Sequence, residues 1–324
     1  MAENAELIKK ADMALSDLSG NGGLLNPEMT DTFLRTLIDS PTIINQCRTV
    51  TMNAPTRKIN KIGFGSRILK VAPQGTSPYA ADDGTNDRYL PAASRSAPTT
   101  SQIQLDTKEL MAEVHIPYEV LEDNIEGGNI GAGPQGSPGG LHSTIVSMIA
   151  ERAALDLEEL LLLGDSGSGD PYLALLDGWL KRSTAHVVNA GGATINKDIF
   201  KAGIKAMPDK YLRNRASLVN FISVDNETEY RDTYAARQTS LGDTMLQGAN
   251  ELRVFGTAIQ SVPLMPEAKG LMTNPLNLIF GIQRRITMEY DKDIRARAFI
   301  IVLTCRVANQ IEETDAVVAY QNIG

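Results

Sequence analysis

The amino-acid sequence predicts an α+β protein that combines a projecting β-hairpin, one long helix and a region of alternating helices and strands. Two patterns carry this prediction. Apolar and basic side chains interleave from Arg57 to Val71, as in a strand with one face in water. From Leu141 to Leu163, apolar side chains recur at the 3.6-residue spacing of a helix. The 324 residues are 42% hydrophobic and 22% charged, a globular composition that excludes a disordered or fibrous chain.

The first 50 residues predict a helical arm. A weak apolar pattern over residues 5–19 is followed by glycines, and a second short helix over residues 27–39 has Pro27 at its start and ends before Pro41. No segment has the roughly 20 apolar residues that a membrane-spanning helix needs, and the chain does not begin with the pattern of a secretory signal. We therefore expect a protein that is made in the cytoplasm and has no membrane partner.

Residues 51–116 predict a long hairpin. The strand pattern at Arg57–Val71 is followed by a second strand pattern at Thr99–Ile116, which can pair with the first. The segment between them, residues 73–98, holds four prolines and few apolar side chains that could be buried. A two-stranded hairpin is marginally stable in water and leaves its edges unpaired. The hairpin should therefore rest on another surface, and a second copy of the chain is the candidate.

The long helix follows a glycine-rich tract at residues 127–140 and ends at Gly164, a residue type common just after helices. One of its faces is apolar and packs against a core. The other face has Arg152 as its only base and carries four acids: Glu151, Asp156, Glu158 and Glu159.

Beyond Pro171 the patterns alternate between helix and strand and show no internal repeat. They predict helices near residues 196–212 and 226–237, and strands at 218–224, 252–262, 277–280, 285–290, 298–307 and 316–320, with a turn at 291–293.

The charges are unevenly distributed along the chain. The net charge is -8, yet residues 51–110 hold 8 basic and 5 acidic side chains, while residues 111–164 hold 9 acids and one base. Two such surfaces attract each other if the fold or a neighbouring copy brings them together. The net negative charge of the chain disfavours non-specific binding to nucleic acid, because such binding needs clustered Lys and Arg.

The sequence contains short patterns that resemble enzyme motifs, but the residues around them do not fit the structures that those motifs need. The pattern GxGxxG at residues 131–136 has no strand before it and contains Pro134, so a flexible linker fits it better than a dinucleotide site. Ser166, in Gly-Asp-Ser-Gly, is like a protease nucleophile but follows a helix, and paired-carboxylate hydrolysis has no specific support. The three histidines and two cysteines show no metal-ligand spacing, so we expect no enzyme activity, cofactor or metal.

The order of these parts resembles the tailed-phage major capsid protein of the Hong Kong ninety-seven fold. The resemblance covers nearly the whole chain, and it is strongest where the leucine-rich helix runs into a turn like GDGTG. The residues that carry it are Val120-Leu121-Glu122-Asp123, Leu161 to Gly169, and an ending composed of Asn277 to Gly281, Ile286 to Glu289, Phe299 to Val307 and Asp315 to Val318.

The resemblance implies a capsid fold of four parts. These are an N-terminal arm (1–50), an extended loop (51–116), a peripheral domain around the spine helix (117–171 and 276–306) and an axial domain (172–275 and 307–324). It also implies hexamers and pentamers that form an icosahedral head shell and enclose double-stranded DNA without specific binding. In such a virion the partners are other copies, with a separate scaffolding protein, a portal and cement proteins as further candidates, and assembly takes place in the host cytoplasm.

In that family the extended loop lies across the peripheral domain of a neighbour, which suggests a use for the charge asymmetry. We hypothesise that five loop cations meet the acidic surface of the adjacent copy at Glu151, Asp156, Glu158 and Glu159. The cations are Arg57, Lys58, Lys61, Arg67 and Lys70. Two other functions stay open at this point: a cellular nanocompartment shell with the same fold, and a serine hydrolase that uses Ser166.

Overall fold

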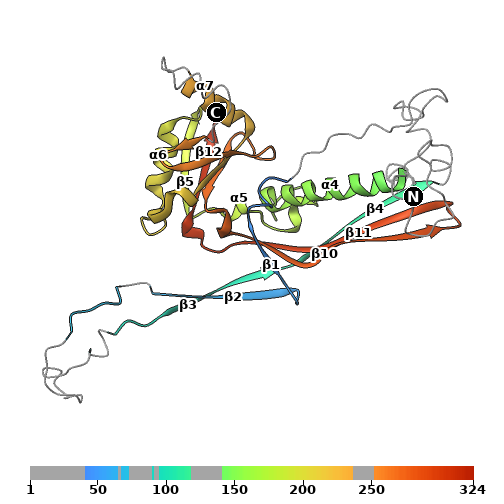
Figure 1. Ribbon diagram of the computed structural model, residues 1–324, viewed down its shortest axis with the longest axis horizontal. Coiled ribbons are helices and arrows are strands. Elements are labelled where there is room, and N and C mark those ends of the chain that lie inside the picture. Colours follow the sequence, from blue (N-terminus) through green and yellow to red (C-terminus); the bar gives the residue numbers. More distant parts are fainter. Residues whose placement is uncertain (1–40, 65–66, 73–89, 91–94, 118–140, 236–251) are drawn as a thin grey trace. The chain divides into compact units, whose positions relative to one another are not determined.

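The computed structural model describes residues 41–64, 67–72, 90, 95–117, 141–235 and 252–324 (Figure 1). The chain divides into two compact units, of which the smaller is Thr56–Leu105 and the larger holds the other described residues. The expected helices of the arm, the turn after Pro117 and the glycine-rich tract lie outside the described residues.

The smaller unit is a hairpin of two strands, β2 (Thr56–Gly63) and β3 (Thr99–Asp106). The first strand is shorter than the sequence predicted, because the ladder ends at Gly63 and the described residues 67–72 are not in a strand. The hydroxyl of Thr99 donates to the carbonyl oxygen of Gly63 at 2.9 Å and closes the pairing there.

A four-stranded sheet forms one layer of the larger unit. Its order is β1-β10-β11-β4, with β1 (Arg48–Thr51) parallel to β10 and the other pairs antiparallel. The two long strands β10 (Leu278–Asp293) and β11 (Ala298–Ile311) come from the end of the chain. Alternate residues of β11 from Phe299 to Val307 are buried, so one face of the sheet is apolar and faces the core.

Two details of this sheet differ from the sequence prediction. Residues 108–116 were expected within the extended loop, but β4 (Lys108–Pro117) pairs with β11 over its whole length. Only Thr107 separates β4 from β3, and its amide donates to the carbonyl of Pro55 at 2.9 Å, which closes the base of the hairpin. The turn between the long strands is at residues 294–297 rather than at 291–293.

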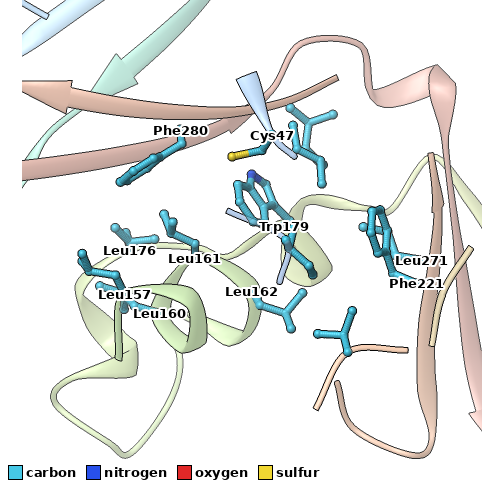
Figure 2. Packing of buried hydrophobic residues seen from close by; sticks show 14 of the residues in the cluster. Cys47, Leu157, Leu160, Leu161, Leu162, Leu176, Trp179, Phe221, Leu271 and Phe280 are labelled. Atoms are coloured by element: carbon cyan, nitrogen blue, oxygen red, sulfur yellow. The ribbon is translucent and has the colours of Figure 1, made fainter. Parts of the chain in front are cut away.

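The long helix α4 (Leu141–Leu163) has the bounds that the sequence predicted. Its last two turns bury Leu157, Leu160, Leu161 and Leu162 in a core together with Trp179 (Figure 2). Phe280 of β10, and Phe221 and Leu271 from the second sheet, belong to the same core. One apolar cluster therefore joins the helix to both sheets of the larger unit.

The second sheet has six strands in the order β5-β12-β9-β6-β8-β7. Its middle is mixed: β12 and β9 are antiparallel, as are β6 and β9, whereas β5 with β12 and β6 with β8 are parallel. The strands are β5 (His186–Ala193), β6 (Val219–Ile222), β7 (Arg253–Val254), β8 (Thr257–Ser261), β9 (Lys269–Thr273) and β12 (Val317–Ile323).

Helices α5 (Trp179–Arg182), α6 (Lys197–Ala206) and α7 (Val224–Ala235) complete the α-helices of the described residues. The side chain of Asn196 caps α6 by accepting from two amides of its first turn. The predicted helix at 196–212 ends early, because Pro208 cannot donate to a fourth preceding carbonyl. Single 3-10 turns occupy Leu173–Leu175, Leu212–Ser217, Pro275–Asn277 and Thr314–Ala316.

The strand predicted at residues 252–262 is a small hairpin. Phe255 and Gly256 both have positive φ, at 48° and 91°, and they form the two-residue turn between β7 and β8. The hydroxyl of Thr257 donates to the carbonyl oxygen of Val254 at 2.7 Å and accepts from the side-chain Nδ2 of Asn220 at 2.8 Å. A buried polar network therefore supports this turn.

Candidate functional site

The cations of the predicted loop surface lie on the hairpin unit. Arg57 and Lys58 are exposed on β2, and Lys61 on the same strand is half-buried. Arg67 and Lys70 are exposed beyond the end of the strand. All five cations therefore belong to one unit.

The same unit exposes large apolar side chains. Within the described part of the hairpin, Leu69 is 84% exposed and Val71 is 90% exposed, although side chains of this kind are usually buried. Large apolar side chains that gather on an exposed surface often mark a binding site. The exposed apolar residues of the unit are Ile62, Phe64, Ile68, Leu69 and Val71.

The acids of α4 do not form one exposed face. Glu151 is exposed, whereas Asp156 is half-buried and pairs with Arg152 through a distance of 2.8 Å from Nε to Oδ1. Glu159 is also half-buried. Three of the four predicted acids can therefore be reached from outside the chain, and one of them already has a cationic partner.

Glu158 was predicted to belong to the acidic face, but the structure shows that it does not. Its residue is 1% exposed, and its carboxylate accepts from the backbone amides of Thr42, at 2.8 Å, and of Ile43. A buried carboxylate needs such donors, because leaving it without them costs several kcal/mol. Glu158 therefore holds the segment that enters the core before β1, and it cannot present its charge to a neighbour.

This segment continues the contact into the core. Ile43 is fully buried, and Cys47 lies in the same apolar cluster as Leu161 and Trp179. Burial raises the pKa of the Cys47 thiol to about 12, with a smaller contribution from the Glu158 charge. The thiol is therefore protonated near neutral pH and has little nucleophilic character.

The turn that follows α4 is built on two glycines. A Cβ atom at Gly164 would lie 2.3 Å from the carbonyl oxygen of Leu176, and one at Gly178 would lie 2.6 Å from that of Leu162. The amide of Gly178 donates to the carbonyl of Gly164 at 2.7 Å. Because backbone approaches backbone here, only glycine fits at both positions.

Two carboxylates fix the loop of this turn. Asp165 accepts from Lys181 and from the amide of Gly167, and these bonds hold its pKa below the usual value, with Lys181 as the main cause. Asp177 accepts from the amide of Ser166 at 2.9 Å, and its pKa is lowered mainly by that bond. Ser166 is thus bonded to a carboxylate rather than to a histidine, and the arrangement lacks the base that a serine nucleophile requires.

A row of charged side chains, which the sequence pattern does not reveal, crosses the four-stranded sheet. Glu109 on β4 accepts from Arg306 on β11 at 2.8 Å and from Arg284 on β10. The two arginines, Arg306 first, hold the pKa of Glu109 below its usual value. Because Arg284 faces Arg306 across the ladder, one carboxylate offsets two like charges that would otherwise repel. These three residues come together only through the register of the strands, which the sequence does not show.

The described residues contain no cluster of three or more His, Cys, Asp or Glu side chains that could bind a metal ion. None of the helices in the described part of the chain is long and apolar enough to span a bilayer.

The comparison with known proteins identifies the family. The chain is 43% identical over 326 aligned residues to YqbE of Bacillus subtilis (strain 168), which is named as a prophage capsid protein, and 97% of each chain is covered. The chain is a member of the phage capsid protein family. No protein-family model matches its sequence. The capsid protein is a structural component of a shell and not an enzyme, which removes the hydrolase and favours a phage head over a cellular compartment.

Solved structures agree with the capsid protein in fold. The capsid of a native GTA particle matches with a TM-score of 0.64 at 12% identity and covers 96% of this chain and 100% of the other. A chain of Microbacterium phage Oxtober96 matches with a TM-score of 0.62 at 14% identity and covers 95% of this chain and 99% of the other. A procapsid of satellite phage P4 that includes its size determination protein matches at 0.58 and 13% identity, over 100% and 96%. The α+β capsid fold is therefore the one that the sequence predicted.

Proposed function

We propose that this capsid protein assembles into hexamers and pentamers that form an icosahedral head shell around phage DNA. The observation that carries the proposal is the apolar surface of the hairpin. Ile62, Phe64, Ile68, Leu69 and Val71 are more than half exposed in the described part of the hairpin unit, where only Ile103 and Leu105 are buried apolar residues. Each such side chain contributes about 1.5–3 kcal/mol when it is fully buried. A neighbouring copy in the shell supplies the missing surface.

The charges of the hairpin orient this contact. We propose that an acidic surface on the adjacent copy binds Arg57, Lys58, Lys61, Arg67 and Lys70. Glu151, Asp156 and Glu159 belong to this acidic surface, whereas Glu158 is buried and does not. Exposed ion pairs are worth only about 0.2–1 kcal/mol each. The charges therefore set the register and the rate of assembly, and apolar burial supplies most of the free energy.

We also propose how the parts of the capsid fold are distributed over the elements of this chain. The four-stranded sheet and α4 form the peripheral domain, the six-stranded sheet with α6 and α7 forms the axial domain, and the extended loop is the hairpin at 56–105. We further propose that assembly occurs in the host cytoplasm and that scaffolding, portal and cement proteins are separate chains.

The test is assembly of the purified chain, followed by light scattering and negative-stain microscopy. We expect shells or ring-shaped capsomers from the wild type, and a soluble 35 kDa species from Leu69→Ser combined with Val71→Ser. The control is Leu69→Ile with Val71→Ile, which keeps the surface apolar and should assemble. A monodisperse monomer of the wild type under all conditions, with or without the neighbouring genes, contradicts the proposal.

The charges are tested in the same assay. Lys58→Glu with Lys61→Glu should slow capsomer formation in dilute salt, whereas Lys58→Arg with Lys61→Arg should not, because the second pair keeps both charges. Equal assembly of the two variants at low ionic strength contradicts the electrostatic part of the proposal and leaves the apolar part standing.

A further inference from the structure

Two helices cover the same face of the six-stranded sheet. The rings of Phe200 on α6 and Tyr230 on α7 meet edge to face, with centroids 5.1 Å apart, and both residues belong to one core cluster. Helix α6 packs on β5 and β12, whereas α7 packs on β8. Since β5 and β12 begin the strand order and β8 lies near its end, α6 packs toward one edge of the sheet and α7 toward the other, and the two helices meet at these rings.

Helix α6 presents a stripe of lysines to solvent. Lys197, Lys201 and Lys205 are four residues apart, so they share one side of the helix, and all three are exposed. The buried residues of α6 lie on another side and include Phe200. Asp198 is the one acid of this helix and is exposed in its first turn.

Helix α7 presents a stripe of acids. Asp225, Glu229 and Asp232 are spaced by four and three residues and are exposed. The remaining acid, Glu227, pairs with Arg231 on the same helix and is therefore neutralised locally. The exposed side of α7 is consequently negative, and the exposed side of α6 is positive.

Within the described part of the chain, none of the six side chains of these stripes takes part in an ion pair. The two stripes belong to one domain, lie on different helices and carry opposite charge in equal number. A surface pattern of this kind fits a second copy of itself that is placed head to tail, which is the contact that generates closed rings.

We propose that, in a ring of copies, the lysine stripe of α6 faces the acidic stripe of α7 on the next copy. The partner is a second copy of this chain, and the inference rests on the proposed assembly into capsomers. The contact is heterologous: each copy contributes its α6 to one neighbour and its α7 to the other. It acts on assembly through electrostatic attraction, because the pairs at its rim stay close to water.

The size of the effect follows from the range of the charges. Complementary surfaces raise association rates by about 10-fold to 1,000-fold at low ionic strength. The screening length is about 10 Å at 0.1 M salt and about 3 Å at 1 M salt. Reversal of one stripe should therefore slow ring formation by about 10-fold or more in dilute salt, and the difference from the wild type should vanish near 1 M salt.

The experiment uses two reversed variants of the full chain. The first carries Lys201→Glu and Lys205→Glu and has acids on both helices, and the second carries Glu229→Lys and Asp232→Lys and has bases on both. Each should assemble slowly alone. Controls with equal changes in charge are Arg213→Glu with Arg215→Glu, and Asp209→Lys with Glu267→Lys, at exposed positions outside both stripes. The controls should assemble at the rate of the wild type.

Mixing distinguishes a contact between copies from one within a chain. When the two reversed variants are mixed in equal amounts, oppositely charged stripes face each other in an alternating ring. Alternation closes only with an even number of copies, so the mixture should recover six-membered rings but not five-membered ones in negative-stain images. Recovery of hexamers supports the proposal.

Three results overturn the proposal while the wild type still forms shells: normal assembly of both reversed variants, equal slowing of the controls, or no recovery on mixing. Failure of the wild type itself to assemble contradicts the proposed function instead. Thermal unfolding of each variant, expected at the temperature of the wild type, shows that the fold is intact.

Discussion

The attachment of the 41–47 segment to α4 depends on one buried side chain, and this gives a sharp test. Glu158→Ala removes the acceptor for the amides of Thr42 and Ile43. A buried donor that loses its partner costs about 1–3 kcal/mol, so the two together predict a loss of about 2–6 kcal/mol. Since about 1.4 kcal/mol corresponds to a factor of ten, the local opening equilibrium should shift by roughly 30-fold to 20,000-fold.

The assay is hydrogen–deuterium exchange of the amides at residues 42–47. We expect faster exchange of Ile43 in Glu158→Ala by that factor, and a smaller change in Glu158→Gln, whose carbonyl oxygen can still accept both bonds. Glu159→Ala is the matched control, because Glu159 is half-buried on the same turn and does not accept from these amides. Unchanged exchange of Ile43 in Glu158→Ala refutes the argument.

Two further predictions concern the turn after α4. Gly178→Ala should destabilise the protein by about 1–3 kcal/mol through overpacking, because the new Cβ would lie 2.6 Å from the carbonyl oxygen of Leu162; Gly169→Ala, with nothing within 4 Å, should have a much smaller effect on the urea midpoint. The lowered pKa of Asp177 means that its stabilising contribution is complete above the ordinary value near 3.9 and is lost as the pH falls through the folded-state pKa. The urea midpoint of Asp177→Asn should therefore fall less between about pH 5 and pH 2 than that of the wild type, and parallel curves would contradict this.

The long helix could be predicted from sequence because two independent signals agree. An apolar stripe runs to Leu163, and Gly164 follows it where backbone contacts admit no side chain. Strand β5 could not be predicted, because His186–Ala193 contains two glycines and no apolar alternation. It becomes a strand through its pairing with β12, which is distant in sequence.

The acidic face of α4 shows why the role of a single functional residue is hard to predict from the sequence. Glu158 and Glu159 are adjacent in sequence, but one step along a helix turns the side chain by about 100°. Only the position of Thr42, 116 residues away, decides that Glu158 points into the core. Sequence composition can thus locate a charged surface, as it did for the hairpin cations, whereas the role of a single charge depends on tertiary contacts.

The strand order around the hairpin has a consequence for synthesis. The hairpin is inserted between β1 and β4, yet these strands are held by β10 and β11, which come about 170 residues later in the chain. At about 5–20 residues per second, the ribosome makes those strands roughly 10–35 s after the hairpin. The base of the hairpin at Pro55 and Thr107 is therefore secured only after β10 and β11 have been made. We expect chains that stop before β10, as after interrupted translation, to lack the strands that anchor the hairpin.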